Sequence, residues 1–176
     1  MGGLIFIDYD RANIGSSDAA PTPRTAARVV SDLHQLLETA DVPGPYVLAG
    51  YGNGGFFVQL YGRRYSDEVE GVVVMNPVAP AHPWLERALP LFDEQVHAEE
   101  RAYYRGNNDE HIDWLASSKQ LENAPQPPSV PFEMLISTER ECLSMPEGRQ
   151  PCLESHEVYE QVTREVTQQW PESSYR

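Results

Sequence analysis

Residues 46–57 read Tyr46-Val47-Leu48-Ala49-Gly50-Tyr51-Gly52-Asn53-Gly54-Gly55-Phe56-Phe57. An apolar run ends in a glycine-rich segment, and a helix-like pattern begins directly after it. This arrangement predicts a strand, a very tight turn and a helix. Glycine adopts positive φ at little cost and lets another backbone approach closely. The turn is therefore expected to present its own backbone N–H groups at a surface where a ligand can bind.

Two known motifs have this shape. The first is the nucleophile elbow G-x-S-x-G, a strained strand-to-helix turn that presents a serine. The second is the dinucleotide fingerprint G-x-G-x-x-G, which Gly50, Gly52 and Gly55 match. A dinucleotide site also needs an acidic residue at the end of the next strand to hold the ribose. That predicted strand is followed by Asn76 and Pro77, so the nucleotide-binding alternative has the glycines without the carboxylate.

The sequences around the elbow favour the first motif. Residues 9–18 read YDRANIGSSD, residues 43–50 read PGPYVLAG, and residues 64–77 read RYSDEVEGVVVMNP. In order and spacing they resemble bacterial members of the α/β-hydrolase family, which read D-R-x-G-x-G-x-S-D, then P-Y-V-L-x-G-H-S-x-G-G, then R-Y-P-D-E-V. The resemblance covers roughly the first 80 residues and is looser in the rest of the chain.

The hydrophobic pattern extends this interpretation to the whole chain. Apolar runs predict strands, and apolar stripes at 3.6-residue spacing predict helices between them, which indicates parallel strands with right-handed crossovers. The fold class is α/β, a reduced α/β-hydrolase-like parallel sheet of about four strands flanked by helices. The predicted strands are 4–9, 46–49, 72–75 and 132–137, and the predicted helices are 25–40, 56–64, 91–104, 109–121 and 158–170.

The proline-rich middle of the chain suggests a separate unit. We expect residues 1–79 and 130–176 to form the α/β core. In the family a helical cap covers the site, and the resemblance implies that residues 80–129 form such a cap or lid here.

Ligands of parallel sheets bind at the carboxyl ends of the strands. We therefore expect one crevice that contains Asp10, Tyr51, Gly52, Asn53 and Asn76, under residues 80–120. The candidate substrate-binding residues are Gly50, Gly52, Asn53, Arg11 and Asn76. The candidate catalytic residues are Tyr51 and Asp10, as proton-transfer groups, and Glu141, which, with Glu139 as the next choice, matches the position of the family's triad acid.

Three departures from the family concern the catalytic groups. Tyr51-Gly52-Asn53 stands where His-Ser-Leu or similar is expected, so the serine nucleophile is absent. The family's catalytic histidine follows one more strand after the closing helix, and we expect this chain to stop where that strand would begin. His156 is expected to precede the closing helix. The H-G loop that supplies half of the oxyanion hole belongs before Leu4, which leaves the backbone N–H of Asn53 as the other half.

Serine-hydrolase chemistry requires a hydroxyl activated by a base, so we predict that the chain is not an ordinary esterase, lipase or peptidase. Three functions stay open. Family relatives without the serine act as cyclases, lyases or isomerases on carbonyl-containing metabolites, which favours a non-hydrolytic small-molecule enzyme. The alternatives are a catalytically inactive pseudo-hydrolase that serves as a binding or assembly subunit, and a nucleotide-binding protein.

Composition sets the remaining limits. The chain has 176 residues, 40% of them apolar, and a net charge of −14, which is typical of a globular protein that binds neither nucleic acid nor an anionic membrane. Neither a membrane span nor a signal peptide is apparent, so a cytoplasmic location is expected. No cofactor is expected. Cys142 and Cys152 have no cluster of histidines beside them, which disfavours a metal site, and they either pair across a loop or stay lone thiols.

The predicted sheet has exposed edges. In the family a strand from the region before Leu4 lies between strand 4–9 and strand 46–49, and strand 132–137 has an outer neighbour. Unpaired rows of N–H and C=O groups are costly when they are buried. We therefore predict a homodimer or a complex with a partner subunit, in addition to a small-molecule ligand.

Overall fold

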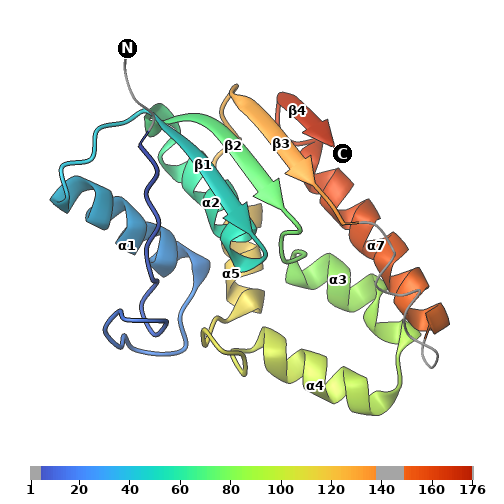
Figure 1. The fold of residues 1–176 in the computed structure, drawn as a ribbon. Coiled ribbons are helices and arrows are strands. Elements are labelled where there is room, and N and C mark those ends of the chain that lie inside the picture. Colours follow the sequence, from blue (N-terminus) through green and yellow to red (C-terminus); the bar gives the residue numbers. More distant parts are fainter. Residues whose placement is uncertain (1–4, 138–148, 176) are drawn as a thin grey trace.

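The computed structural model of the chain describes residues 5–137 and 149–175, without the side chains of residues 149–151 and 172–175. A wholly parallel sheet of four strands in the order β1-β2-β3-β4 forms its centre (Figure 1). The strands are β1 (Tyr46–Tyr51), β2 (Val69–Met75), β3 (Pro131–Leu135) and β4 (Glu172–Tyr175). The predicted fold class, an α/β fold with a parallel sheet of about four strands and flanking helices, is confirmed.

Helices α2 (Asn53–Arg64), α5 (Trp114–Glu122) and α7 (Arg149–Thr167) lie behind the strands in Figure 1, on one face of the sheet. α2 starts directly after the glycine-rich turn and packs on β1 and β2 through a buried face that includes Phe56 and Leu60. The described helices are α1 (Ala26–Thr39), α2 (Asn53–Arg64), α3 (Ala81–Arg87), α4 (Glu94–Tyr104), α5 (Trp114–Glu122) and α7 (Arg149–Thr167), with 3-10 turns η1 (Ser66–Glu68) and η2 (Leu89–Leu91).

α5 belongs to the segment predicted to form a cap, and it contributes to the core. Trp114 is fully buried and stacks on Phe57 with 5.7 Å between ring centroids. The first backbone N–H of α1 donates to Ser117 Oγ at 2.9 Å, and the second donates to Gln120 Oε1 at 2.8 Å. Side chains of α5 thus satisfy N–H groups that the start of a helix leaves unpaired. The division into core and cap stays a prediction.

The predicted strand 4–9 is wrong for the residues that the structure describes. Residues 5–9 form no strand, and Ile5, Phe6 and Ile7 are 78%, 87% and 50% exposed. An apolar run becomes a strand only where another strand pairs with it, and β1 pairs on one side only, with β2.

The fourth strand lies at the other end of the sequence. β4 pairs in parallel with β3 from Glu172 beside Pro131 to Tyr175 beside Met134. The predictions that the chain stops where this strand begins, and that strand 132–137 lacks an outer neighbour, are therefore wrong. Its sequence, Glu-Ser-Ser-Tyr, lacks the apolar run that marked the other strands.

The helix boundaries also differ from the prediction. The predicted helix 91–104 begins later, at Glu94, where the Asp93 carboxylate accepts hydrogen bonds from two backbone N–H groups and caps α4. The predicted helix 109–121 begins at Trp114, after the N-cap residue Asp113. The closing helix α7 starts at Arg149, so His156 lies inside it and does not precede it.

Candidate functional site

The turn between β1 and α2 has the geometry of an elbow. Gly52 has φ 53° and ψ −120°, a conformation that residues with a Cβ adopt at a cost in strain. Its N–H donates to the carbonyl oxygen of Met75 at 3.0 Å, and its carbonyl accepts from Val78 N at 3.2 Å, which ties the turn to the end of β2. A Cβ at Gly52 would have no atom within 4 Å, so the apex faces open space.

The neighbouring glycines serve the packing of strand and helix. A Cβ on Gly50 would lie 2.3 Å from the carbonyl carbon of Gly54, and one on Gly55 would lie 3.0 Å from Pro77 Cβ. Close packing therefore explains the glycines at positions 50 and 55, two of the three in the fingerprint, without a bound nucleotide. Nucleotide binding through Gly50, Gly52 and Gly55 stays a prediction.

A half-buried ion pair lies beside the elbow. Arg11 donates from Nε and Nη2 to the two carboxylate oxygens of Glu110, both at 2.7 Å, and Asn53 Nδ2 donates to Glu110 Oε1 at 2.7 Å. Glu110 is 8% exposed, and the guanidinium of Arg11 lies 5.3 Å from the centre of the Phe57 ring. Glu110 thus fixes two residues that the sequence predicted as substrate-binding.

Glu110 stabilises the charged form of the Arg11 guanidinium. Burial alone would lower the pKa of Arg11, but the hydrogen bonds and the negative charge of Glu110 outweigh burial and raise that pKa. Bidentate guanidinium–carboxylate geometry also fixes the orientation of both groups. The side chain of Asn53, the first residue of α2, is therefore held in place at the elbow.

Asp10 has a structural role in its own loop. Its carboxylate accepts from Ser16 N at 2.8 Å, and its carbonyl accepts from Ser17 Oγ at 2.5 Å. A Cβ on Gly15, which has φ +57°, would lie 2.2 Å from the Asp10 carboxylate. These contacts close the loop after residue 9, and the contacts described for Asp10 do not reach Gly52.

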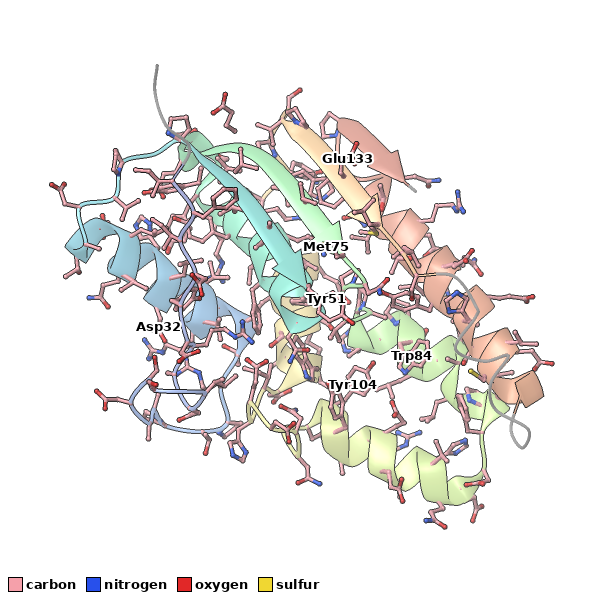
Figure 2. The ribbon with its side chains drawn as sticks, in the orientation of Figure 1. Asp32, Tyr51, Met75, Trp84, Tyr104 and Glu133 are labelled. Carbon is pink, nitrogen blue, oxygen red and sulfur yellow. The ribbon has the colours of Figure 1, made fainter. Side chains whose placement is uncertain are left out.

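The other predicted site residues are distributed along the ends of the strands. Tyr51 is 70% exposed at the end of β1 (Figure 2). Asn76 has φ +41°; its N–H donates to the Leu135 carbonyl at 2.9 Å, and its Oδ1 accepts from Ser137 N at 2.5 Å, which joins the ends of β2 and β3. Glu139 and Glu141 lie outside the described residues.

The site that the structure assembles thus differs in part from the predicted one. Arg11 and Asn53 come together, whereas Asp10 bonds within its own loop and Asn76 bonds to residues at the end of β3. Glu110 is not among the predicted site residues, because it follows α4 in a loop and carries no motif. Its partners lie 99 and 57 positions away, so only the folded chain reveals its role.

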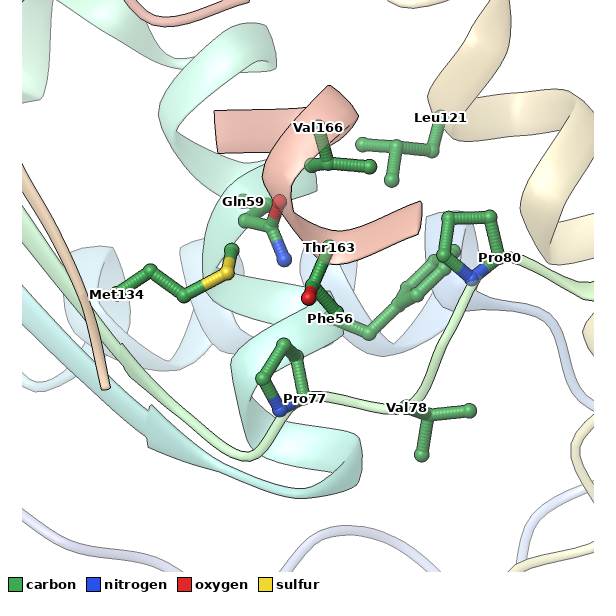
Figure 3. Close-up of a pocket in the computed structure, with 9 residues that line it drawn as sticks. All are labelled: Phe56, Gln59, Pro77, Val78, Pro80, Leu121, Met134, Thr163 and Val166. Atoms are coloured by element: carbon green, nitrogen blue, oxygen red, sulfur yellow. The ribbon is translucent and has the colours of Figure 1, made fainter. Parts of the chain in front are cut away.

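A small pocket lies on the helix side of the sheet, where α2, α5 and α7 meet β3 (Figure 3). Its free volume is about 10 Å³, room for roughly one water molecule. The side-chain Nε2 of Gln59 donates to Gly55 O at 2.9 Å, and the side-chain Oε1 has no partner among the described residues. The lining residues, none of them a predicted site residue, are Phe56, Gln59, Pro77, Val78, Pro80, Leu121, Met134, Thr163 and Val166.

Two absences concern only the part of the chain that the structure describes. None of its helices has the length and the apolar composition that a bilayer span requires. Its His, Cys, Asp and Glu side chains form no group of three or more suited to a metal ion. Cys152 is disulfide-bonded, and Cys142 lies outside the described residues.

Comparison with known proteins identifies the fold. A family model described as alpha/beta hydrolase fold matches residues 6–138. A probable hydrolytic enzyme from Pseudomonas aeruginosa PAO1 superimposes with a TM-score of 0.54 at 17% identity, covering 95% of this chain and 66% of that one. A bromoperoxidase from Bacillus anthracis superimposes with a TM-score of 0.52, also at 17% identity, covering 96% and 71%.

Two fungal proteins share part of the sequence. An uncharacterized protein of Schizosaccharomyces pombe is 37% identical over 68 residues, which are 39% of this chain and 13% of that protein. An uncharacterized vacuolar membrane protein of Saccharomyces cerevisiae is 32% identical over 69 residues, 39% of this chain and 11% of that protein. The chain therefore spans only a small part of the length of these relatives.

Proposed function

The chain belongs to the α/β-hydrolase fold family, and we propose that it is a non-hydrolytic member, a small-molecule enzyme of the cyclase, lyase or isomerase type. One observation carries the proposal. Gly52 has the strained backbone of a nucleophile position, with open space where a side chain would point, and supplies no hydroxyl. Covalent catalysis of the serine-hydrolase kind requires that hydroxyl.

The elbow retains groups that bind an oxygen atom. Asn53 begins α2, so its backbone N–H lies at the positive end of the helix dipole and has no partner within the helix. Such an N–H stabilises a carbonyl oxygen on which negative charge develops. Tyr51 precedes the apex and is exposed, which suits a proton-transfer group. The substrate class is accordingly a small metabolite with a carbonyl or carboxylate group.

Ester hydrolysis tests the negative part of the proposal. The purified chain and Gly52→Ser are both expected to leave p-nitrophenyl acetate unhydrolysed above background, because serine alone lacks an activating base. Gly52→Ser should also lose about 1–3 kcal/mol of stability, since serine is strained at φ 53°. Hydrolysis that co-purifies with the chain and disappears in Glu141→Gln would contradict the proposal.

Ligand binding tests the positive part. We expect small keto acids, with pyruvate, acetoacetate and 2-oxoglutarate as probes, to raise the Tm of the wild type. Asn53→Pro removes the backbone N–H at a helix position that tolerates proline, and it should abolish the shift. Asn53→Ala keeps that N–H and should retain part of it. Asn123→Ala, at the end of α5, is the control and should bind as the wild type does.

No stabilisation by any probe would leave the second candidate, a catalytically inactive pseudo-hydrolase that serves as a binding or assembly subunit. Exposed apolar side chains on β1 favour that alternative, because such surfaces commonly bind other polypeptides. A cytoplasmic location is part of the proposal in both cases.

A further inference from the structure

The small pocket on the helix side of the sheet contains an unpaired polar atom. Gln59 of α2 is 2% exposed, and its side-chain Oε1 has no hydrogen-bond partner among the described residues. Its Nε2 donates to the carbonyl oxygen of Gly55, which fixes the orientation of the amide, because exchanging the two atoms would set two acceptors against each other. Buried acceptors are rarely left unpaired, since an unmade hydrogen bond is costly. Gln59 Oε1 therefore requires a donor that the described residues do not supply.

A second polar side chain lines the same pocket. Thr163 of α7 is 1% exposed, and its hydroxyl donates to the carbonyl oxygens of Tyr159 and Glu160, at 2.8 and 3.1 Å. A hydroxyl has one proton to donate and two lone pairs that accept. The proton of Thr163 is used within α7, so Thr163 Oγ1 can only accept from a group in the pocket. Figure 3 shows the side-chain oxygens of Gln59 and Thr163 among the apolar side chains of the lining.

The pocket has the size and the polarity that a single water molecule needs. Its free volume of about 10 Å³ admits roughly one water molecule and leaves no room for a larger ligand. A buried water needs roughly two to four polar partners, and the two side-chain oxygens are enough. None of the residues that line the pocket is charged, so an ion would have no counter-charge there.

We propose that this pocket is a binding site for one buried water molecule, which donates hydrogen bonds to Gln59 Oε1 and Thr163 Oγ1. Both protons of the water are then used, and both acceptors receive the donor that they lack. The water bridges α2 and α7, two helices that lie far apart in the sequence. Its role is structural, and it takes no part in the proposed reaction.

The water site lies next to the residues that hold the elbow. Pro77 and Val78 line the pocket, and Val78 N donates to the carbonyl oxygen of Gly52 at 3.2 Å. The hydroxyl of Tyr159, one turn before Thr163 on α7, donates to the carbonyl oxygen of Pro77 at 2.7 Å. The water adds to this link a hydrogen-bonded bridge from α7 to α2, the helix that starts at the elbow.

Magnetic relaxation dispersion of the water oxygen nucleus tests the proposal, because it counts water molecules that stay inside a protein for longer than the protein tumbles. Gln59→Leu removes the first acceptor. Thr163→Val keeps the shape of threonine and removes the second. Each variant should lose about one long-lived water molecule relative to the wild type, because one remaining partner does not hold a buried water.

Thr167→Val is the matched control. The hydroxyl of Thr167 also donates to a carbonyl oxygen of α7, at 2.8 Å, but Thr167 does not line the pocket, so this variant should keep the water. Far-UV circular dichroism checks that each variant folds, and Thr163→Val alone decides if Gln59→Leu does not. An unchanged count in a folded Gln59→Leu or Thr163→Val, or a loss in Thr167→Val as well, would overturn the proposal.

A high-resolution crystal structure tests the position of the water. We expect one peak of electron density about 2.5–3.0 Å from both Gln59 Oε1 and Thr163 Oγ1 in the wild type, and no such peak in Thr163→Val. A pocket without density, or a Gln59 Oε1 bonded to another protein group, would disprove the bridge. None of these variants changes a residue of the elbow turn, so the outcome is independent of the proposed function.

Discussion

The two faces of the sheet carry similar side chains in different surroundings. On the helix face, Val72 and Val74 of β2 and Met134 of β3 are at most 1% exposed. On the other face, β1 exposes Val47 at 63%, and Leu135 of β3 is 38% exposed. Similar apolar side chains of the sheet thus differ in exposure because different elements lie over the two faces. Hydrophobic patterning identifies a strand, but the elements packed on it decide which of its side chains stabilise the fold.

The largest difference between the faces is expected in β3, where Met134 and Leu135 are adjacent. Met134→Ala removes a buried side chain that packs under α7 and should lower the free energy of unfolding by about 2–5 kcal/mol. Leu135→Ala, on the open face, should cost less than about 1 kcal/mol. Urea denaturation measures both, and equal losses would mean that the open face is covered in solution.

Glycines on the two faces provide the second comparison. Gly50→Ala places a Cβ 2.3 Å from the backbone of α2 and should destabilise the chain by about 1–3 kcal/mol, because strand and helix must separate. Gly71→Ala meets its nearest atom at 3.6 Å, an ordinary contact, and should stabilise by up to about 1 kcal/mol. Thermal denaturation of both variants checks the order, and a neutral Gly50→Ala would contradict the close approach.

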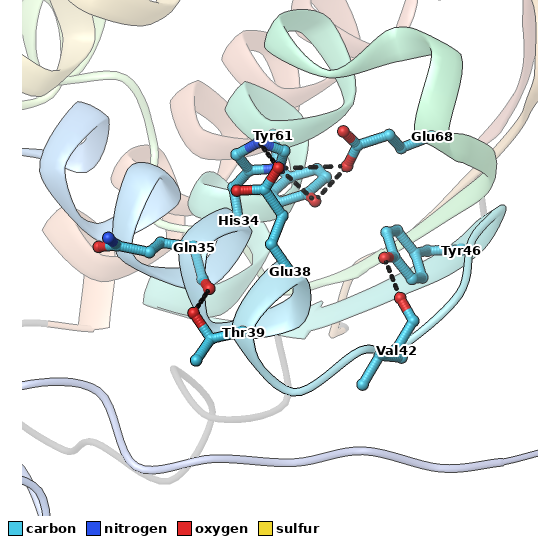
Figure 4. A network of polar contacts seen from close by, with 8 residues as sticks. All are labelled: His34, Gln35, Glu38, Thr39, Val42, Tyr46, Tyr61 and Glu68. Atoms are coloured by element: carbon cyan, nitrogen blue, oxygen red, sulfur yellow. Dashed lines mark hydrogen bonds and ion pairs between the residues drawn. The ribbon is translucent and has the colours of Figure 1, made fainter.

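The smallest expected effect on stability concerns Tyr61 of α2, on the helix face of the sheet. Tyr61 is fully buried, its hydroxyl donates to Glu68 Oε2 at 2.7 Å, and His34 lies beside both (Figure 4). The pKa of Tyr61 is raised above its ordinary value of 10.0. Burial is the largest cause, and the hydrogen bond to Glu68 and the charge of Glu68 add to it.

The sign of the pH dependence follows from this shift. Below pH 10 the hydroxyl is protonated in both states, and above it the unfolded chain loses the proton first, so stability falls as pH rises. We expect a loss of about 1 kcal/mol between pH 9 and pH 11 that Tyr61→Phe removes, measured by urea denaturation at each pH. A Tyr61→Phe variant with the same slope as the wild type would show that other groups cause the loss.

Much of the fold was predictable because its signals are local. The glycines of the elbow, the apolar stripe of α1 and the apolar runs of β1 and β2 act through neighbouring residues, and each element formed where the sequence indicated. The elbow in particular needs only the backbone freedom of Gly52 and the absence of a side chain at Gly50.

The remaining features depend on contacts between distant residues. Segment 5–9 is as apolar as β1, but it has no neighbouring strand, whereas the short polar β4 has one in β3. Glu110 is a loop carboxylate until folding places Arg11 and Asn53 around it. By itself the sequence determined the turn, the helix stripes and the glycine in place of a serine at position 52, because these follow from residue type and spacing. Only the tertiary structure decided which runs pair, which charges are buried and which face of the sheet stays open, because these depend on partners far apart in the chain.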